Sequence, residues 1–185
     1  GGGREAGRRP LHEGRRGRDG RRAPHEVLGG TEVRDPVGTA VGSRTTASGV
    51  NSTALGNQVE AKASGSIAIQ GNSANVVAVD VGSTSAVAIG TSSTVTSSVS
   101  GVALGEGASV TSASKGIALG SGAAVTAANS VALGAGSTTT STLGTAAYNP
   151  GSATLSGIAS TANGEVSIGS STKERRLTNL AAGSA

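Results

Sequence analysis

The chain has 185 residues, of which 31 are Gly, and it contains no Cys, Met, Trp or Phe and a single Tyr, Tyr148. A core must therefore be built from Val, Ile, Leu and Ala, and so thin a core is typical of repeat architectures. The absence of Cys excludes a disulfide framework and a thiolate metal site. The formal net charge of +4 lies at the two ends, because residues 45–171 hold two Lys against four acidic residues.

Residues 1–37 form a basic segment that is rich in Gly and Arg and poor in apolar side chains. It cannot bury enough surface to offset its ordering entropy, so we expect it to be disordered. An arginine-rich nucleic-acid arm is the alternative, but no aromatic residue lies between the arginines to stack on bases. We therefore expect no nucleic-acid partner.

From about residue 38 a five-residue phrase of the form x-V-A-L-G recurs. It reads STALG, SIAIQ, VVAVD, AVAIG, GVALG, GIALG and SVALG in chain order. These copies occupy residues 52–56, 66–70, 76–80, 86–90, 101–105, 116–120 and 130–134. Their last apolar residues are 14, 10, 10, 15, 15 and 14 positions apart. Each phrase alternates apolar, Ala and apolar residues, which predicts a β-strand.

A second, weaker alternation follows each phrase, as Ala108 and Val110 follow Leu104. Turns that contain Gly separate the two alternations. Each repeat therefore predicts two very short strands. About 14 residues per two-strand turn fits a narrow parallel β-roll whose turns stack at about 4.8 Å. We expect an all-β fold, with this roll over residues 38–170.

One Ala stands at the centre of every phrase. These residues are Ala54, Ala68, Ala78, Ala88, Ala103, Ala118 and Ala132. A strand points this position away from its two neighbours. If Val, Ile and Leu fill the interior, the alanines form a flat outward stripe that packs lengthwise against further copies of the chain. The opposite orientation, with Ala inward and Val or Leu toward the partner, predicts the same self-association. A third interpretation is that Ala merely fits a tight roll.

The sequence offers little for catalysis. His12 and His25 are its two histidines and both lie in the basic segment, which leaves the repeats without a Ser–His pair, a His metal cluster or the catalytic His of hexapeptide-repeat acyltransferases. The acidic residues of the repeats are single and far apart, so they form neither a carboxylate pair nor a calcium repeat. We predict no enzyme activity, no catalytic residue, no metal site and no cofactor.

Two other features bear on function. Thr138-Thr139-Thr140 suggests an ice-binding solenoid, but a flat threonine array needs Thr at the same place on many turns, where we expect Ala, Val or Ser. No run of about 18 apolar residues is present, so we predict no membrane span in this stretch of sequence.

The repeats resemble the head of YadA-like trimeric autotransporter adhesins, whose SVAIG-type phrases recur about 14 residues apart. The end of the chain, STKERRLTNLAAGSA, resembles the neck of that family, R-Q-I/L-T-N-V-A-A-G. The residues that match it are Arg175, Leu177, Thr178, Asn179, Ala181, Ala182 and Gly183. Arg176 stands where Gln is usual and Leu180 where Val is usual. The phrase at 165–169 matches the strand that precedes the neck.

The resemblance implies a homotrimer of left-handed parallel β-rolls at the surface of a Gram-negative bacterium, outside the outer membrane. Residues 171–185 would be a neck that passes each chain to the next protomer and leads into a coiled-coil stalk beyond this sequence. The neck could begin a helix or wrap the bottom of the roll, and residues 143–164 form an irregular turn or an insertion. Stalk and anchor lie outside the sequence given, so we expect no membrane insertion by this part.

The function that the resemblance implies is adhesion to host cells or extracellular matrix proteins, through multivalent non-catalytic contacts. A structural spacer within a surface fibre, with no ligand of its own, is the alternative. The sequence does not identify the residues that bind a ligand.

Overall fold

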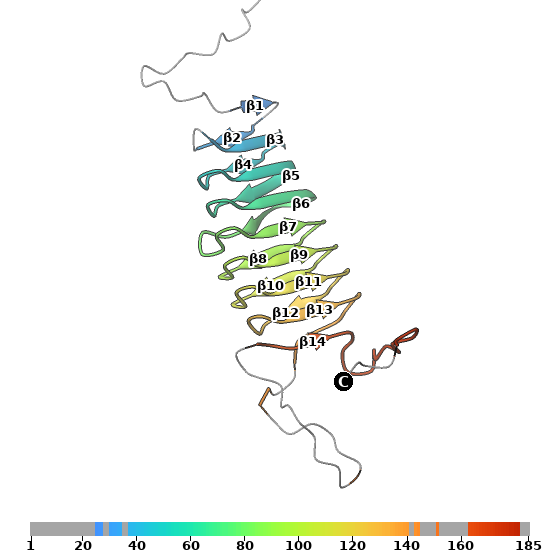
Figure 1. Ribbon diagram of the computed structural model, residues 1–185. Coiled ribbons are helices and arrows are strands. Elements are labelled where there is room, and N and C mark those ends of the chain that lie inside the picture. Colours follow the sequence, from blue (N-terminus) through green and yellow to red (C-terminus); the bar gives the residue numbers. More distant parts are fainter. Residues whose placement is uncertain are drawn as a thin grey trace, which may run out of the picture.

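The computed structural model describes residues 25–27, 30–34, 37–140, 143–144, 151 and 163–181. These residues contain strands and turns and no helix. The strands lie one above another in chain order and form an elongated rod, with the N-terminal turns at the top of Figure 1 and the last turn at the bottom. All strand pairings among the described residues are parallel, so this part of the chain is a parallel β-solenoid.

Each regular turn contributes one strand to each of two sides. The first side carries the strands of the recurring phrase. They are β1 (His25–Val27), β3 (Thr39–Ser43), β5 (Thr53–Ala61), β6 (Ile67–Val79), β7 (Val87–Ile89), β9 (Val102–Leu104), β11 (Ile117–Leu119), β13 (Val131–Leu133) and β14 (Val166–Ser167). The second side carries β2 (Glu32–Val33), β4 (Thr46–Ala47), β8 (Thr94–Thr96), β10 (Ser109–Thr111) and β12 (Ala124–Val125). The long strands β5 and β6 run across both sides.

The first side is in strict register, with Ala stacked on Ala in successive turns. The ladder contains Ala40, Ala54, Ala68, Ala88, Ala103, Ala118 and Ala132. All seven have no exposed surface in the single chain. The alanines therefore point into the roll, and the prediction that they form an outward stripe is wrong. The alternative prediction is confirmed, in which Ala points inward and the flanking Val, Ile and Leu point outward.

The second side supplies the larger side chains of the core. Its inward column is mostly valine, and the residues Val79, Val95, Val110 and Val125 are fully buried. These valines reach across to the corners, since a Cβ added to Gly101 would lie 2.8 Å from a methyl of Val95. The same atom added to Gly116 would lie 2.8 Å from a methyl of Val125. The valine methyls therefore lie close to these corners and leave little free space in the interior of the roll.

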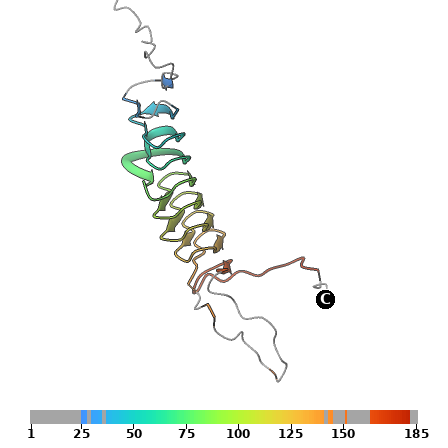
Figure 2. The ribbon, with the colours of Figure 1, turned by 60° about the vertical axis from the view of Figure 1, so that its left-hand side comes forward.

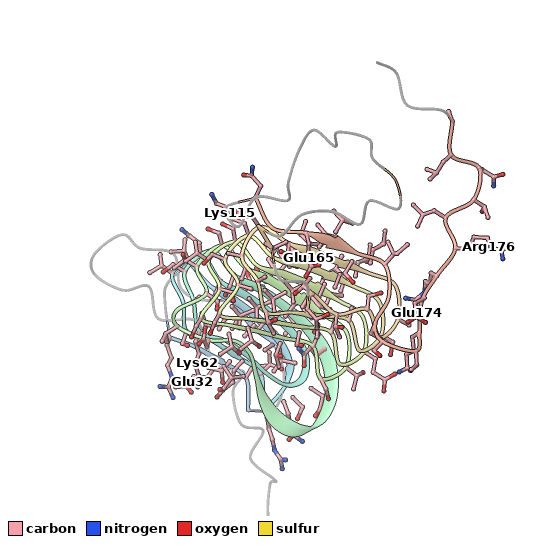
Figure 3. All side chains as sticks on the ribbon, turned by 90° about the horizontal axis from the view of Figure 1, so that it is seen from below. Glu32, Lys62, Lys115, Glu165, Glu174 and Arg176 are labelled. Carbon is pink, nitrogen blue, oxygen red and sulfur yellow. The ribbon has the colours of Figure 1, made fainter. Side chains whose placement is uncertain are left out.

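Between β3 and β13 one turn is longer than the others, and it overturns one expected strand. The phrase at 76–80 pairs with residues of the second side, as Val79 does with Val95. The spacings of 10 and 10 therefore belong to a single turn of 20 residues, and Ala78 is buried inside the second side and not in the alanine ladder. The chain of β6 bulges out of the stack at this turn (Figures 2 and 3).

The start of the roll also differs from the expected boundary at residue 38. Strand β1 pairs with β3, residue His25 with Thr39, and β2 pairs with β4. The roll therefore begins inside the segment predicted to be disordered, of which residues 1–24, 28–29 and 35–36 lie outside those described. At the other end β14 pairs directly with β13, so residues 134–165 connect neighbouring strands. Most of the irregular stretch 143–164 lies outside the described residues.

Candidate interaction surface

The first side presents two columns of apolar side chains to the outside. Alternation fixes this arrangement, because the residues on either side of each inward Ala must point out. One column holds Ile67, Val87, Val102, Ile117 and Val131, and the other holds Val41, Leu55, Ile69, Ile89, Leu104, Leu119 and Leu133. Thr39 and Thr53 occupy the first column in the two uppermost of these turns. No outward residue of β3, β7, β9, β11 or β13 is charged.

These side chains are only half covered in the single chain. Ile117 is 39% exposed, Leu119 is 42% exposed and Leu133 is 43% exposed. A large apolar patch on a soluble protein marks a surface that contacts another molecule. This one extends along the rod from β3 to β13, and we refer to it below as the apolar face. Sequence reasoning weighed this orientation but did not prefer it.

The second side is polar by comparison. Its outward residues include two ion pairs near the top, Arg34–Glu32 and Lys62–Glu60, each with an N–O distance of 2.9 Å. The hydrogen bond and the charge of Glu32 raise the pKa of Arg34, an exposed guanidinium that is charged at neutral pH in any case. Figure 3 shows Glu32 and Lys62 on the same side of the roll. The polar second side is suited to contact with water, whereas the apolar first side is suited to contact with another protein surface.

Lower down, the second side carries threonines. Thr96, Thr111, Thr126 and Thr140 are exposed and stack on successive turns. This column is more regular than the sequence suggested. The neighbouring column is mixed, because it holds Thr94, Ser109, Ala124 and Thr138 in that order. The side thus lacks the two complete threonine columns of a flat array.

The corner after each phrase strand is a second exposed feature. Glu106, Ser121 and Ala135 are exposed there. The corners stack through backbone bonds, in which Gly122 N donates to Glu106 O at 2.7 Å and Gly136 N donates to Ser121 O at 2.8 Å. Side chains at these positions face solvent and vary from turn to turn without disturbing the ladder.

The neck residues are held to the roll at one point. Arg175 donates from Nη1 to Ser137 Oγ at 2.9 Å and to the carbonyl of Ile168 at 2.6 Å, and from Nη2 to the carbonyl of Ala135. Residues 171–181 form no helix, and after Arg175 they leave the last turn uncovered; Leu177 and Leu180 are 54% and 72% exposed. Thr178, Asn179 and Ala181 are also exposed, whereas Ala182 and Gly183 lie outside the described residues. Figure 1 shows this segment leaving the roll.

The described part of the chain holds no group of three His, Cys, Asp or Glu side chains placed to bind a metal ion. Nor does it contain a helix of the length and apolarity needed to cross a bilayer. The apolar face and the corners are therefore the features on which a function can be built.

Comparison with known proteins gives one family. The YadA head domain repeat matches in two copies, at residues 38–58 and 112–137. No curated protein matches the sequence at a significant level. The turns between the two copies continue the same Ala-on-Ala register, so the structure joins both copies into one solenoid. Residues 38–58 and 112–137 are thus two copies of the YadA head domain repeat, and the roll that joins them resembles the head of a YadA-like trimeric autotransporter adhesin.

Proposed function

We propose that this chain is the head of a bacterial surface adhesin that binds host cells or extracellular matrix proteins as a homotrimer. The family to which the repeat belongs is a family of non-enzymatic adhesins exposed at the outer membrane. The observation that carries the proposal is the apolar face, which runs the length of a rod made of that repeat. Three copies packed through this face would leave the polar sides and the corners in solvent.

The energetics favour assembly through the apolar face. Complete burial of a Leu or Ile side chain is worth about 1.5–3 kcal/mol, so covering one that is about 40% exposed contributes roughly 1 kcal/mol. Many such residues line each chain. In a cyclic trimer, each apolar face would turn toward the common axis and different parts of it would meet the two neighbours, a contact that closes into a ring when the rotation between copies closes. The number of copies, three, comes from the family and not from the face itself.

Adhesion would use the exposed corners. Each corner is small, so a single contact would be weak. A trimer repeats it three times around the rod, a rod repeats it along its length, and many copies on a cell add further multivalency. Linked weak contacts of this kind raise the overall avidity by about 10²–10⁴. The neck, residues 171–185, would lead from the head into a stalk.

A binding assay tests the proposal. The purified chain is applied to surfaces coated with collagen, fibronectin or laminin and to cultured host cells. A matched variant carries Leu119→Glu, which places a charge in the apolar face while leaving the corners unchanged. We expect the unmodified chain to bind at least one surface, and the variant to lose apparent affinity by about 100-fold or more, because multivalency is lost.

The control for charge is Thr111→Glu, which places the same carboxylate on the polar second side. It should leave assembly unchanged. If the unmodified chain assembles but binds none of these proteins or cells, adhesion by this head is refuted and the spacer alternative stands. If Thr111→Glu lowers binding as much as Leu119→Glu does, the effect is electrostatic and the proposed role of assembly is wrong.

A further inference from the structure

The lower end of a solenoid presents backbone acceptors that the next turn would normally satisfy. In the regular turns, the donors that satisfy these acceptors are the amides of glycines in the turn below. Gly105, Gly120 and Gly134 donate their N–H groups to the last phrase carbonyl of the turn above, at 2.9, 2.8 and 2.7 Å. At the corner, Gly107 N donates to Thr91 O at 2.8 Å, and Gly122 and Gly136 do the same one and two turns below.

In the last turn, side chains take over this role. The corner carbonyl is Ala135 O, which is equivalent to Ser121 O and Glu106 O, and it accepts from Arg175 Nη2. The last phrase carbonyl is Leu133 O, which accepts from the Ser137 hydroxyl at 2.8 Å. Arg175 Nη1 in turn donates to Ser137 Oγ. The two acceptors that glycine amides serve elsewhere are here served by a hydroxyl and a guanidinium.

The guanidinium also occupies the same space as the missing peptide. A Cβ added to Gly105 or Gly120 would lie 2.6 or 2.5 Å from the carbonyl carbon of the glycine in the next turn. The same atom added to Gly134 would instead meet Arg175, with Cζ at 3.0 Å and Nε and Nη1 at 3.2 Å. The planar group of Arg175 thus lies against Gly134 where a peptide plane lies against the glycines above.

We infer that Arg175 ends the roll by acting as a substitute for the peptide group of a further turn. A guanidinium suits this role because it is planar and carries five N–H donors in a fixed fork, whereas a lysine ammonium is a compact point charge. Unpaired acceptors at a sheet edge are costly and invite pairing with other chains. Arg175 is therefore a positioning residue, which closes the edge and fixes where the chain leaves it. The inference does not depend on the adhesin proposal.

Hydrogen exchange of the full chain, resolved by residue, tests this inference. Arg175→Ala removes the donors, and Arg175→Lys keeps the charge without the planar fork. Arg176→Ala is the matched control, because Arg176 is the next residue and is exposed, pointing away from the roll in Figure 3. We expect Arg175→Ala to raise the exchange rates of the Gly136, Ser137 and Thr138 amides about tenfold or more.

Arg175→Lys should retain little of the protection, and Arg176→Ala should retain all of it. The amides of Gly107 and Gly122, further up the roll, should be unaffected. A second variant covers the case in which Arg175→Ala does not fold. Ser137→Ala removes one of the three acceptors and places at this corner the residue that Ala108 and Ala123 already provide two turns and one turn above.

Ser137→Ala should give a smaller increase, confined to the last turn. The inference is overturned if Arg175→Ala and Arg176→Ala have the same exchange pattern. It is also overturned if Arg175→Lys retains full protection, because charge alone would then explain the contact.

Discussion

Alanine and glycine have separate roles in each repeat, and both follow from how closely the turns approach one another. The inward Ala is limited by the valines opposite it. The Gly that ends each phrase is limited by the turn below. At Gly105 the backbone has φ +130°, and an added Cβ would lie 2.6 Å from the carbonyl carbon of Gly120. At Gly107, two residues later, φ is +63° and no atom lies within 4 Å of the added Cβ.

These two glycines allow a prediction within one corner. Gly105→Ala should lower the free energy of unfolding by at least about 2 kcal/mol, because it combines a Gly-only backbone conformation with a clash against backbone. Gly107→Ala should cost only about 1 kcal/mol, the strain of Ala in the left-handed region. Denaturant unfolding at one fixed protein concentration measures both. Equal losses would show that the close approach at Gly105 does not limit the fold.

At the scale of the strand, the sequence predicts where the strands lie but not which of their two faces points into the roll. Alternation and spacing predict short parallel strands of about 14 residues per turn, and the structure confirms them. Alternation alone does not say which side is inside. That choice depends on the width of the roll, which is set by the valines of the second side and the small residues at the corners. Both are properties of packing between segments far apart in sequence.

The sequence analysis misplaced one strand and missed another, and both errors have a physical explanation. The phrase at 76–80 has the composition of a first-side strand, but the long turn before it shifts it to the second side. The spacings of 10 residues on either side of this phrase, in place of 14 or 15, were the sequence signal that it belongs to a different side of the roll. Strand β1 was missed because its neighbours are Arg-rich, although His25 precedes Thr39 by the regular 14 positions. Ala40 was overlooked in the same region, where the phrase reads T-A-V-G.

The tightness of the interior gives a prediction at this scale. Ala118→Leu adds a larger side chain to a filled core and should destabilise the chain by about 1–3 kcal/mol. Thr111→Leu adds the same side chain at an exposed position on the adjacent side and should change stability by less than about 0.5 kcal/mol. Thermal and denaturant unfolding distinguish the two. A harmless Ala118→Leu would mean that the roll can widen and that its alanines are not required.

For the whole molecule, the structure accounts for a rod with one apolar and one polar long side. Contacts run mainly between neighbouring turns, so the rod can be lengthened by adding repeats and needs closure only at its ends. Arg175 provides closure at the lower end. The apolar face is the feature that a single chain leaves exposed to water. The resemblance found in the sequence supplies the assembly, a homotrimer, that would cover this face.

Sedimentation of the purified chain tests this central claim most directly. The account predicts a folded species with about three times the chain mass of 17.5 kDa, at micromolar concentration and physiological salt. Leu119→Glu should shift that mass toward a single chain, and Thr111→Glu should not. A folded chain that sediments as a monomer, with circular dichroism of a β-protein, would contradict the claim that the apolar face is covered by further copies.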